Sequence, residues 1–206
     1  MYSPSYNRLE DRAELLAFMR ANNFPVLVTG TGGTLHASHL PVMIGRTEPR
    51  LVLDMHMARN NPQWQEFFED QEVMVVFSGP HAYVSPRWYE EKERVPTWNY
   101  AAVHVYGLPK INPEREKKYE SQRRLVAAMD PQWLPEFDRL SEKYVTMMLE
   151  GIVNFEITVT RIETRWKLSQ NRNRREMELI AAQLDKSPDS LEKALAALTR
   201  KHLPPE

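Results

Sequence analysis

The sequence contains no cysteine, which excludes disulfide bonds, thiolate metal sites and cysteine nucleophiles. It has no apolar run long enough to span a bilayer, and its first residues lack the pattern of a signal peptide. Acidic and basic residues nearly balance, at 28 and 27, so no generally basic surface for nucleic acid is expected. We therefore expect a soluble, cytoplasmic protein without a membrane partner.

Several signatures of nucleotide binding and catalysis are also missing. GTGG at residues 30–33 is followed by a strand pattern and by no Lys-Ser/Thr pair, so it is not a P-loop, and no dinucleotide fingerprint occurs. No GxSxG elbow supports a catalytic triad. His36 and His39 would point to opposite faces of one strand, and no HExxH spacing occurs. We therefore expect no metal site, and the catalytic residues, if any, stay undefined.

The first half of the chain predicts a helix followed by strands. Asn7 and Glu10 resemble a capping box, and apolar residues then recur at helical spacing to about Ala21. Residues 24–45 predict a hairpin with a glycine turn. Further extended segments are predicted at residues 50–57, 72–79 and 81–86.

A strand with two different faces is predicted at residues 97–107. One face carries Ala101, Val103 and Val105, and the other carries rings, namely Trp98, Tyr100, His104 and Tyr106. Core packing explains the apolar face. Aromatic side chains with polar tips suit the wall of a flat cofactor or a subunit interface, which are the two hypotheses for the other face.

The second half predicts helices around one more strand. Residues 113–149 are helical in composition with an interruption near Asp130 and Pro131, and residues 151–169 alternate as a strand does. Two short helices are predicted within residues 173–186 and 187–203, the second opened by Ser187 and Pro188. Without repeats or a low-complexity linker, this order favours one α+β domain with a helical C-terminal extension.

A candidate anion site lies in HMARNNPQW, residues 56–64. Asn60 or Asn61 could cap a short helix whose first turn holds Pro62, and Arg59 stands just before that helix. Unpaired amides and a positive helix dipole at such a place suit a phosphate. The alternative is that Arg59 is merely solvated and Asn60 only caps.

A run of cations lies in RWKLSQNRNRRE, residues 165–176. The run contains five cations, which could contact DNA phosphates, bind a cofactor phosphate or form a solvated turn. No helix-turn-helix pattern stands beside them. The cations are Arg165, Lys167, Arg172, Arg174 and Arg175.

Five blocks taken in order carry a family resemblance: ASHLPV, HMARNNPQW, SGPHAYVSPRWY, VPTWNYAAVHVYG and KLSQNR. From MYSPSYN to about Leu184 the chain resembles the PaiB-like family, FMN-binding negative transcriptional regulators. That resemblance implies an α+β split β-barrel, similar to pyridoxamine phosphate oxidase, with peripheral and C-terminal helices. It also implies FMN as cofactor, bound at the interface of a homodimer. Residues 1–170 would form the FMN-binding domain and residues 171–206 the extension.

The resemblance places the flavin phosphate at Ala58, Arg59 and Asn60. The implied cofactor-binding positions are Ser38, His39, Leu40, Asp54, Met55, His56, Ala58, Arg59, Asn60, Trp98, Lys167 and Gln170. At residues 34–43 this chain has TLHASHLPVM where the oxidases carry basic residues. That departure weakens phosphate binding from this strand and argues against oxidase activity.

Three functions follow from the resemblance. The first is an FMN-binding regulator that senses flavin, redox state or a small ligand and acts on DNA or on a regulatory protein partner. The alternative is an FMN-dependent oxidoreductase, in which the protein positions the flavin and tunes its electrostatics. A haem-binding or haem-degrading split barrel is the third.

Overall fold

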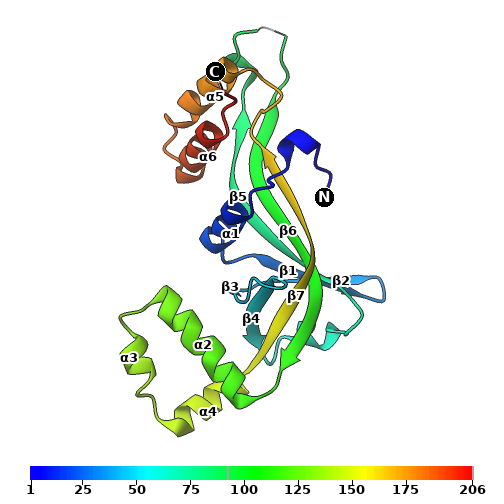
Figure 1. Ribbon diagram of the computed structural model, residues 1–206, viewed down its shortest axis with the longest axis vertical. Helices are drawn as coiled ribbons and strands as arrows, with labels where there is room; N and C mark the ends of the chain where they lie inside the picture. The colour runs from blue at the N-terminus through cyan, green and yellow to red at the C-terminus, as the bar shows by residue number, and fades with distance from the viewer. Residues whose placement is uncertain (92, 206) are drawn as a thin grey trace. The chain divides into compact units, whose positions relative to one another are not determined.

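Seven strands form one sheet in the order β2-β1-β5-β6-β7-β4-β3 in the computed structural model, which describes residues 1–91 and 93–205 (Figure 1). The chain divides into two compact units. Unit 1 comprises Met1–Phe18, Ser78–His104 and Glu163–Glu206, and unit 2 comprises Met19–Phe77 and Val105–Ile162. Three long strands contribute to both units: β5 Val73–Val84, β6 Thr97–Asn112 and β7 Ile152–Lys167.

The strands of unit 2 begin with the predicted hairpin. β1 Val26–Thr31 pairs antiparallel with β2 Thr34–His39, and the turn between them uses Gly32 and Gly33 at φ 59° and 85°. Only glycine adopts such angles at no steric cost, so the glycine turn is confirmed. The antiparallel pairs continue with β3 Val42–Ile44 on β4 Val52–Ala58, and with β4 on β7.

Three helices of unit 2 connect β6 to β7. They are α2 Arg115–Met129, α3 Leu134–Phe137 and α4 Glu142–Glu150 (Figure 1). The interruption predicted near Asp130 is confirmed, because the N–H of Asp130 closes α2 on Val126. Ser141 caps α4 by accepting from the N–H of Tyr144 at 3.4 Å.

Unit 1 holds the C-terminal helices and most of the N-terminal helix α1, and two predicted helix starts were wrong. Asn7 ends the short 3₁₀ turn η1 Ser5–Asn7, whereas α1 Arg12–Ala21 begins after Asp11, whose side chain accepts from the N–H of Glu14. α5 Arg174–Leu184 is capped by Asn173. α6 Ser190–Lys201 begins after Asp189, which accepts from the N–H of Leu191, and not at Ser187 and Pro188. For α1 and α6, the two helices whose starts were predicted wrongly, an aspartate closer to the helix is the cap.

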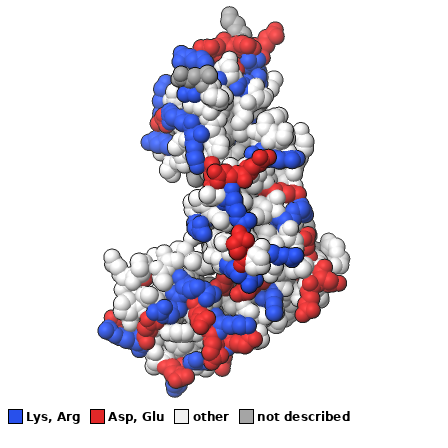
Figure 2. All heavy atoms as spheres, viewed as in Figure 1, with Lys and Arg blue, Asp and Glu red and all other residues white. Residues whose placement is uncertain are grey.

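The two faces predicted for residues 97–107 are confirmed in β6. Ala101, Val103 and Val105 are buried, whereas Trp98 is 49% exposed. The segment at residues 81–86 is not a separate strand, because β5 runs unbroken from Val73 to Val84. In the part of the chain that the structure describes, no helix has the length and apolar character to span a membrane. Basic and acidic side chains are interspersed on the face drawn in Figure 2.

Candidate functional site

The predicted anion site is the turn that follows β4. β4 ends at Ala58, and the 3₁₀ helix η2 Pro62–Glu66 begins after Asn61. The Asn61 side chain caps η2 by accepting from the N–H of Gln63 at 3.0 Å, so Asn61 rather than Asn60 is the cap. The short helix predicted here is therefore the 3₁₀ helix η2, which ends at Glu66.

Arg59 is exposed and lies against the end of α4. Its Nε donates to the carbonyl of Glu150 at 2.6 Å, and an Nη donates to the carbonyl of Ile152 at 3.3 Å. Its own N–H donates to the carbonyl of Gly151 at 2.9 Å. No carboxylate among the described residues forms an ion pair with Arg59, so its charge is not neutralised within the described chain.

A second cation, Lys118 of α2, shares the Ile152 carbonyl with Arg59. Its buried Nζ donates to the carbonyls of Leu149 at 3.2 Å and Ile152 at 3.3 Å. Burial, and then the nearby charge of Arg59, lower the pKa of the Lys118 ammonium group. The Glu150 carboxylate opposes this shift, but the two cations that meet at the Ile152 carbonyl still favour an anion at this turn.

Ser38 of β2 is brought to the same turn. Its Oγ accepts a hydrogen bond from Nδ2 of Asn61 at 2.9 Å, which ties the hairpin to the residues after β4. His39 is exposed, with its ring 5.9 Å from that of Phe24, and Leu40 is buried. The Ser38 hydroxyl and the turn that carries Arg59 therefore lie close together, and both groups can bind a phosphate.

Asp54, Met55 and His56 lie side by side on β4, with different surroundings. Met55 is buried in the core, and the buried Asp54 carboxylate accepts hydrogen bonds from other side chains. Burial lowers the pKa of His56, although the charge of Asp54 opposes the shift, so the imidazole is neutral at pH 7. A neutral imidazole can still donate one hydrogen bond and accept another.

The partners of Asp54 are residues that sequence patterns did not identify. Ser121 Oγ donates at 2.9 Å, Arg124 Nη2 at 2.7 Å and Asn154 Nδ2 at 3.0 Å. Lys118 and Ser121 are three residues apart on the buried face of α2. That spacing of polar residues on a buried face is the only sequence signal of a buried polar contact in α2. It does not show that the contact is with Asp54 on β4.

Three of the predicted positions belong to unit 1, namely Trp98, Lys167 and Gln170, and the other nine belong to unit 2. Lys167 donates to Thr97 Oγ1. Gln170 is occupied locally, since its Oε1 accepts from the N–H of Leu168 at 2.7 Å and its Nε2 donates to the carbonyl of Trp166. The Trp98 ring lies 5.8 Å from that of His81, as measured between centroids.

The basic run of residues 165–176 is divided by its contacts. Arg174 pairs with Glu178 at 2.9 Å and Arg175 pairs with Glu90 at 3.3 Å. The other three cations, Arg165, Lys167 and Arg172, line a pocket of about 190 Å³ within unit 1. Burial, and then the charge of Arg165, lower the pKa of Lys167. The run is therefore not an array of five free cations.

Metal chemistry finds no support in the described residues, where no three His, Asp or Glu side chains are grouped to hold an ion. The sites just described offer cations, amides and hydroxyls, which suit anions rather than metals.

Comparison with known proteins gives matches along most of the chain. A family model described as "Putative FMN-binding domain" matches residues 1–161. "Protease synthase and sporulation protein PAI 2" of Bacillus subtilis (strain 168) is 36% identical over 207 residues, covering 96% of each chain.

Solved structures also resemble this chain. The flavocytochrome Anf3 from Azotobacter vinelandii has a TM-score of 0.59 and 16% identity, over 78% of this chain and 69% of its own. The FAD and Heme binding protein from Mycobacterium smegmatis has a TM-score of 0.61 and 12% identity, over 78% and 73%. At these identities the likeness shows the fold alone, and it confirms the predicted α+β split β-barrel.

Proposed function

This chain belongs to the family of FMN-binding domains that includes the PaiB-like proteins, and we propose that its turn at residues 58–61 holds the phosphate of that FMN. The observation that carries the proposal is the charge of Arg59, fixed by two backbone carbonyls and paired with no described carboxylate. A phosphate dianion would complete the turn, with Lys118 adding positive potential behind it.

The other expected positions fit this placement in different ways. The Ser38 hydroxyl accepts a hydrogen bond from Asn61, which supports a place for Ser38 beside the proposed phosphate, whereas the resemblance puts it beside the flavin ring. His39, Leu40, Asp54, Met55 and His56 would contribute through backbone groups and shape, since the side chains of Asp54 and Met55 are buried. Trp98, Lys167 and Gln170 stay predictions, as does the domain boundary between residues 170 and 171. Bound FMN would supply redox chemistry through its isoalloxazine ring.

A regulatory role is the function we favour for this flavoprotein. The name of the Bacillus relative concerns protease and sporulation and mentions no redox reaction. Two of the five cations in residues 165–176 are paired with carboxylates, and the other three line a small pocket, so DNA reading by this run has little support. We therefore favour regulation through a partner protein or a weak DNA contact over groove recognition.

DNA binding tests how such a regulator would act, and turnover tests whether the protein is an oxidoreductase instead. We expect DNA affinity to be weak, with log K falling against log salt at a slope of about −3 or shallower, because at most three cations are available. Titrations with random duplex DNA at several salt concentrations, with and without FMN, measure that slope.

One result would overturn the expectation of weak DNA binding, and another would overturn the regulatory role. One is tight, sequence-selective DNA binding that charge reversal at Arg172, Arg174 and Arg175 abolishes while flavin absorbance stays intact. The other is steady reoxidation of reduced FMN by an added acceptor, faster than by oxygen alone, which would favour the oxidoreductase.

We also propose a homodimer, with rings of β5 and β6 near the interface. Tyr83 and Trp98 are 45% and 49% exposed, with ring centroids 6.4 Å apart, so a large aromatic surface is open in the single chain. Light scattering is expected to give twice the 24.2 kDa mass of the chain. A mass of one chain with FMN bound would contradict the dimer, and Trp98→Ala tests whether this surface contributes.

A further inference from the structure

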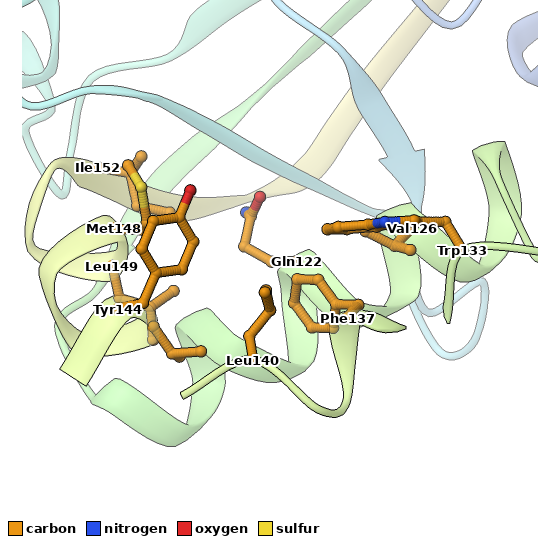
Figure 3. A pocket seen from close by; sticks show the side chains of 10 residues that line it. Gln122, Val126, Trp133, Phe137, Leu140, Tyr144, Met148, Leu149 and Ile152 are labelled. Atoms are coloured by element: carbon orange, nitrogen blue, oxygen red, sulfur yellow. The ribbon is translucent and has the colours of Figure 1, made fainter. Parts of the chain in front are cut away.

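The pocket of about 190 Å³ within unit 1 is lined by three cations, Arg165, Lys167 and Arg172. None of the three forms an ion pair with a carboxylate among the described residues, and no described lining residue is acidic. The pocket among α2, α3 and α4 of unit 2 differs, because none of the residues that line it is charged (Figure 3). Unit 1 therefore contains a small, positively charged site.

The alternation of side chains along two neighbouring strands brings two of the cations to this pocket. Arg165 and Lys167 are two residues apart at the end of β7, and Thr97 and Asn99 are two apart at the start of β6. Lys167 Nζ donates to Thr97 Oγ1, which holds the ammonium group against β6. A hydroxyl orients this ammonium group and leaves its charge uncancelled.

The third cation, Arg172, is positioned by a turn after β7 with an uncommon backbone conformation. Ser169 has φ 67°, a left-handed value that few residues other than glycine adopt. The N–H of Arg172 donates to the Ser169 carbonyl at 2.9 Å and closes the turn. Nδ2 of the buried Asn99 donates to Ser169 Oγ at 2.9 Å, so the turn is also fixed from β6. A costly conformation is thus maintained in the wall of the pocket, which is typical of functional sites.

The groups that orient the cations do not neutralise them. Arg165 donates to the carbonyl of Tyr2, and its guanidinium carbon lies 5.3 Å from the centroid of the Tyr2 ring. The guanidinium carbon of Arg172 lies 5.5 Å from the centroid of the Tyr89 ring. Burial, and then the charge of Arg165, lower the pKa of Lys167, and no described carboxylate opposes this shift. An anion in the pocket would relieve the repulsion among these cations.

The Asn7 side chain is a second, independent indication of a bound molecule. Asn7 lines the pocket and is only 3% exposed, yet its amide forms no hydrogen bond to a described residue. The amide atoms keep some accessible surface, unlike the enclosed Nε of Arg165, so a molecule in the pocket can reach them. A nearly buried amide without a partner costs free energy, and a polar group of a ligand would recover it.

We propose that this pocket binds a small aromatic monocarboxylate, whose carboxylate accepts hydrogen bonds from Lys167 and Arg172. Sites for drug-sized molecules measure about 300 to 1,000 Å³, so the smaller volume here favours a compact ligand. Tyrosine rings in the lining suit a ligand with one ring. FMN, with its tricyclic ring and ribityl phosphate, exceeds this volume. The proposal goes beyond FMN binding and does not depend on it, and a small organic acid would suit a regulator as its signal.

Benzoate and benzamide are a matched pair of probes for this site, followed by ligand-observed NMR titration. They have nearly the same shape and differ in charge, so the native chain is expected to bind benzoate more tightly by about tenfold or more. Lys167→Met and Arg172→Gln are each expected to weaken benzoate binding by about tenfold and to leave benzamide binding unchanged. Arg175→Gln is the control, because Arg175 belongs to the same run, pairs with Glu90 and does not line the pocket. Its benzoate affinity is expected to equal that of the native chain.

A carboxylate supplied by the chain itself is a further test. Thr97→Asp places a carboxylate beside Lys167, which Thr97 already contacts, and is expected to abolish benzoate binding. Thr97→Val has a similar size and no charge, and is expected to retain it. Because the aspartate would neutralise a cation, the thermal midpoint of Thr97→Asp without probe is expected to equal or exceed that of Thr97→Val. If Lys167→Met or Arg172→Gln does not fold, this pair decides the result.

FMN is the competitor to test, since the family resemblance assigns Lys167 to the cofactor. Saturating FMN and the substitution Arg59→Ala are each expected to leave benzoate affinity unchanged, so failure of the phosphate site at residues 58–61 would not affect this result. Displacement of benzoate by FMN would overturn the proposal, because the pocket would then belong to the cofactor site. Equal affinity for benzoate and benzamide, undiminished benzoate binding in folded Lys167→Met, or binding of inorganic phosphate without benzoate would overturn it as well.

Discussion

Replacing Arg59 with alanine is expected to weaken FMN binding by roughly tenfold or more. A charge-assisted hydrogen bond from a guanidinium to phosphate contributes about 1.5 to 3 kcal/mol, and 1.4 kcal/mol corresponds to one factor of ten. Arg59 is prepared for this contact, because two carbonyls at the end of α4 already orient its guanidinium. Quenching of FMN fluorescence on titration with the protein measures the change.

Controls separate the phosphate contact from the support that Arg59 gives to α4. Arg59→Lys keeps the charge and loses the planar fork, so its affinity is expected to lie between those of the native chain and Arg59→Ala. Arg139→Ala removes an equal charge whose partner is Glu136, and is expected to leave FMN affinity unchanged. If Arg59→Ala binds FMN as the native chain does, Arg59 is not part of the site.

Local patterns predicted the elements that short-range physics determines. The Gly32–Gly33 turn and the two faces of β6 follow from backbone freedom and from alternation along a strand. The break near Asp130 was also visible, since the residues after it disfavour a helix. The predictions of helix starts were less accurate. Asn7 and Ser187 are residue types that favour helix caps, but Asp11 and Asp189 cap these helices in the structure.

The candidate site shows the same limit more strongly. HMARNNPQW contained the sequence signal for Arg59, because cap, proline and cation lie within nine residues. Lys118 stands 59 positions further along the chain, and only folding brings it to the Ile152 carbonyl that Arg59 also bonds. The pairing of Arg175 with Glu90 was likewise invisible, so a run of cations suggested more free charge than the folded chain presents.

Replacing Asp54 with alanine is expected to destabilise the protein by about 3 kcal/mol. The carboxylate is 4% exposed and accepts from Ser121, Arg124 and Asn154. Its loss leaves the buried Ser121 hydroxyl without its acceptor, while Asn154 keeps the Met55 carbonyl and Ser121 Oγ as acceptors. Removing one partner of such a network costs the desolvation of the groups that remain. Urea unfolding without added FMN measures the free energy of unfolding.

Arg124→Ala is the matched variant, because it removes the third donor from the same carboxylate. The Arg124 side chain is 54% exposed, and water screens its pair with Asp54, so the expected cost is about 1 kcal/mol or less. Equal losses for Asp54→Ala and Arg124→Ala would show that the ion pair, and not the buried network, supplies the stability.

Asp54→Asn then tests whether Asp54 contributes to FMN binding, at a temperature where the variant is folded. Since both carboxylate oxygens face α2 and β7 donors, its FMN affinity is expected to fall less than that of Arg59→Ala, and a larger fall would place Asp54 against the cofactor itself.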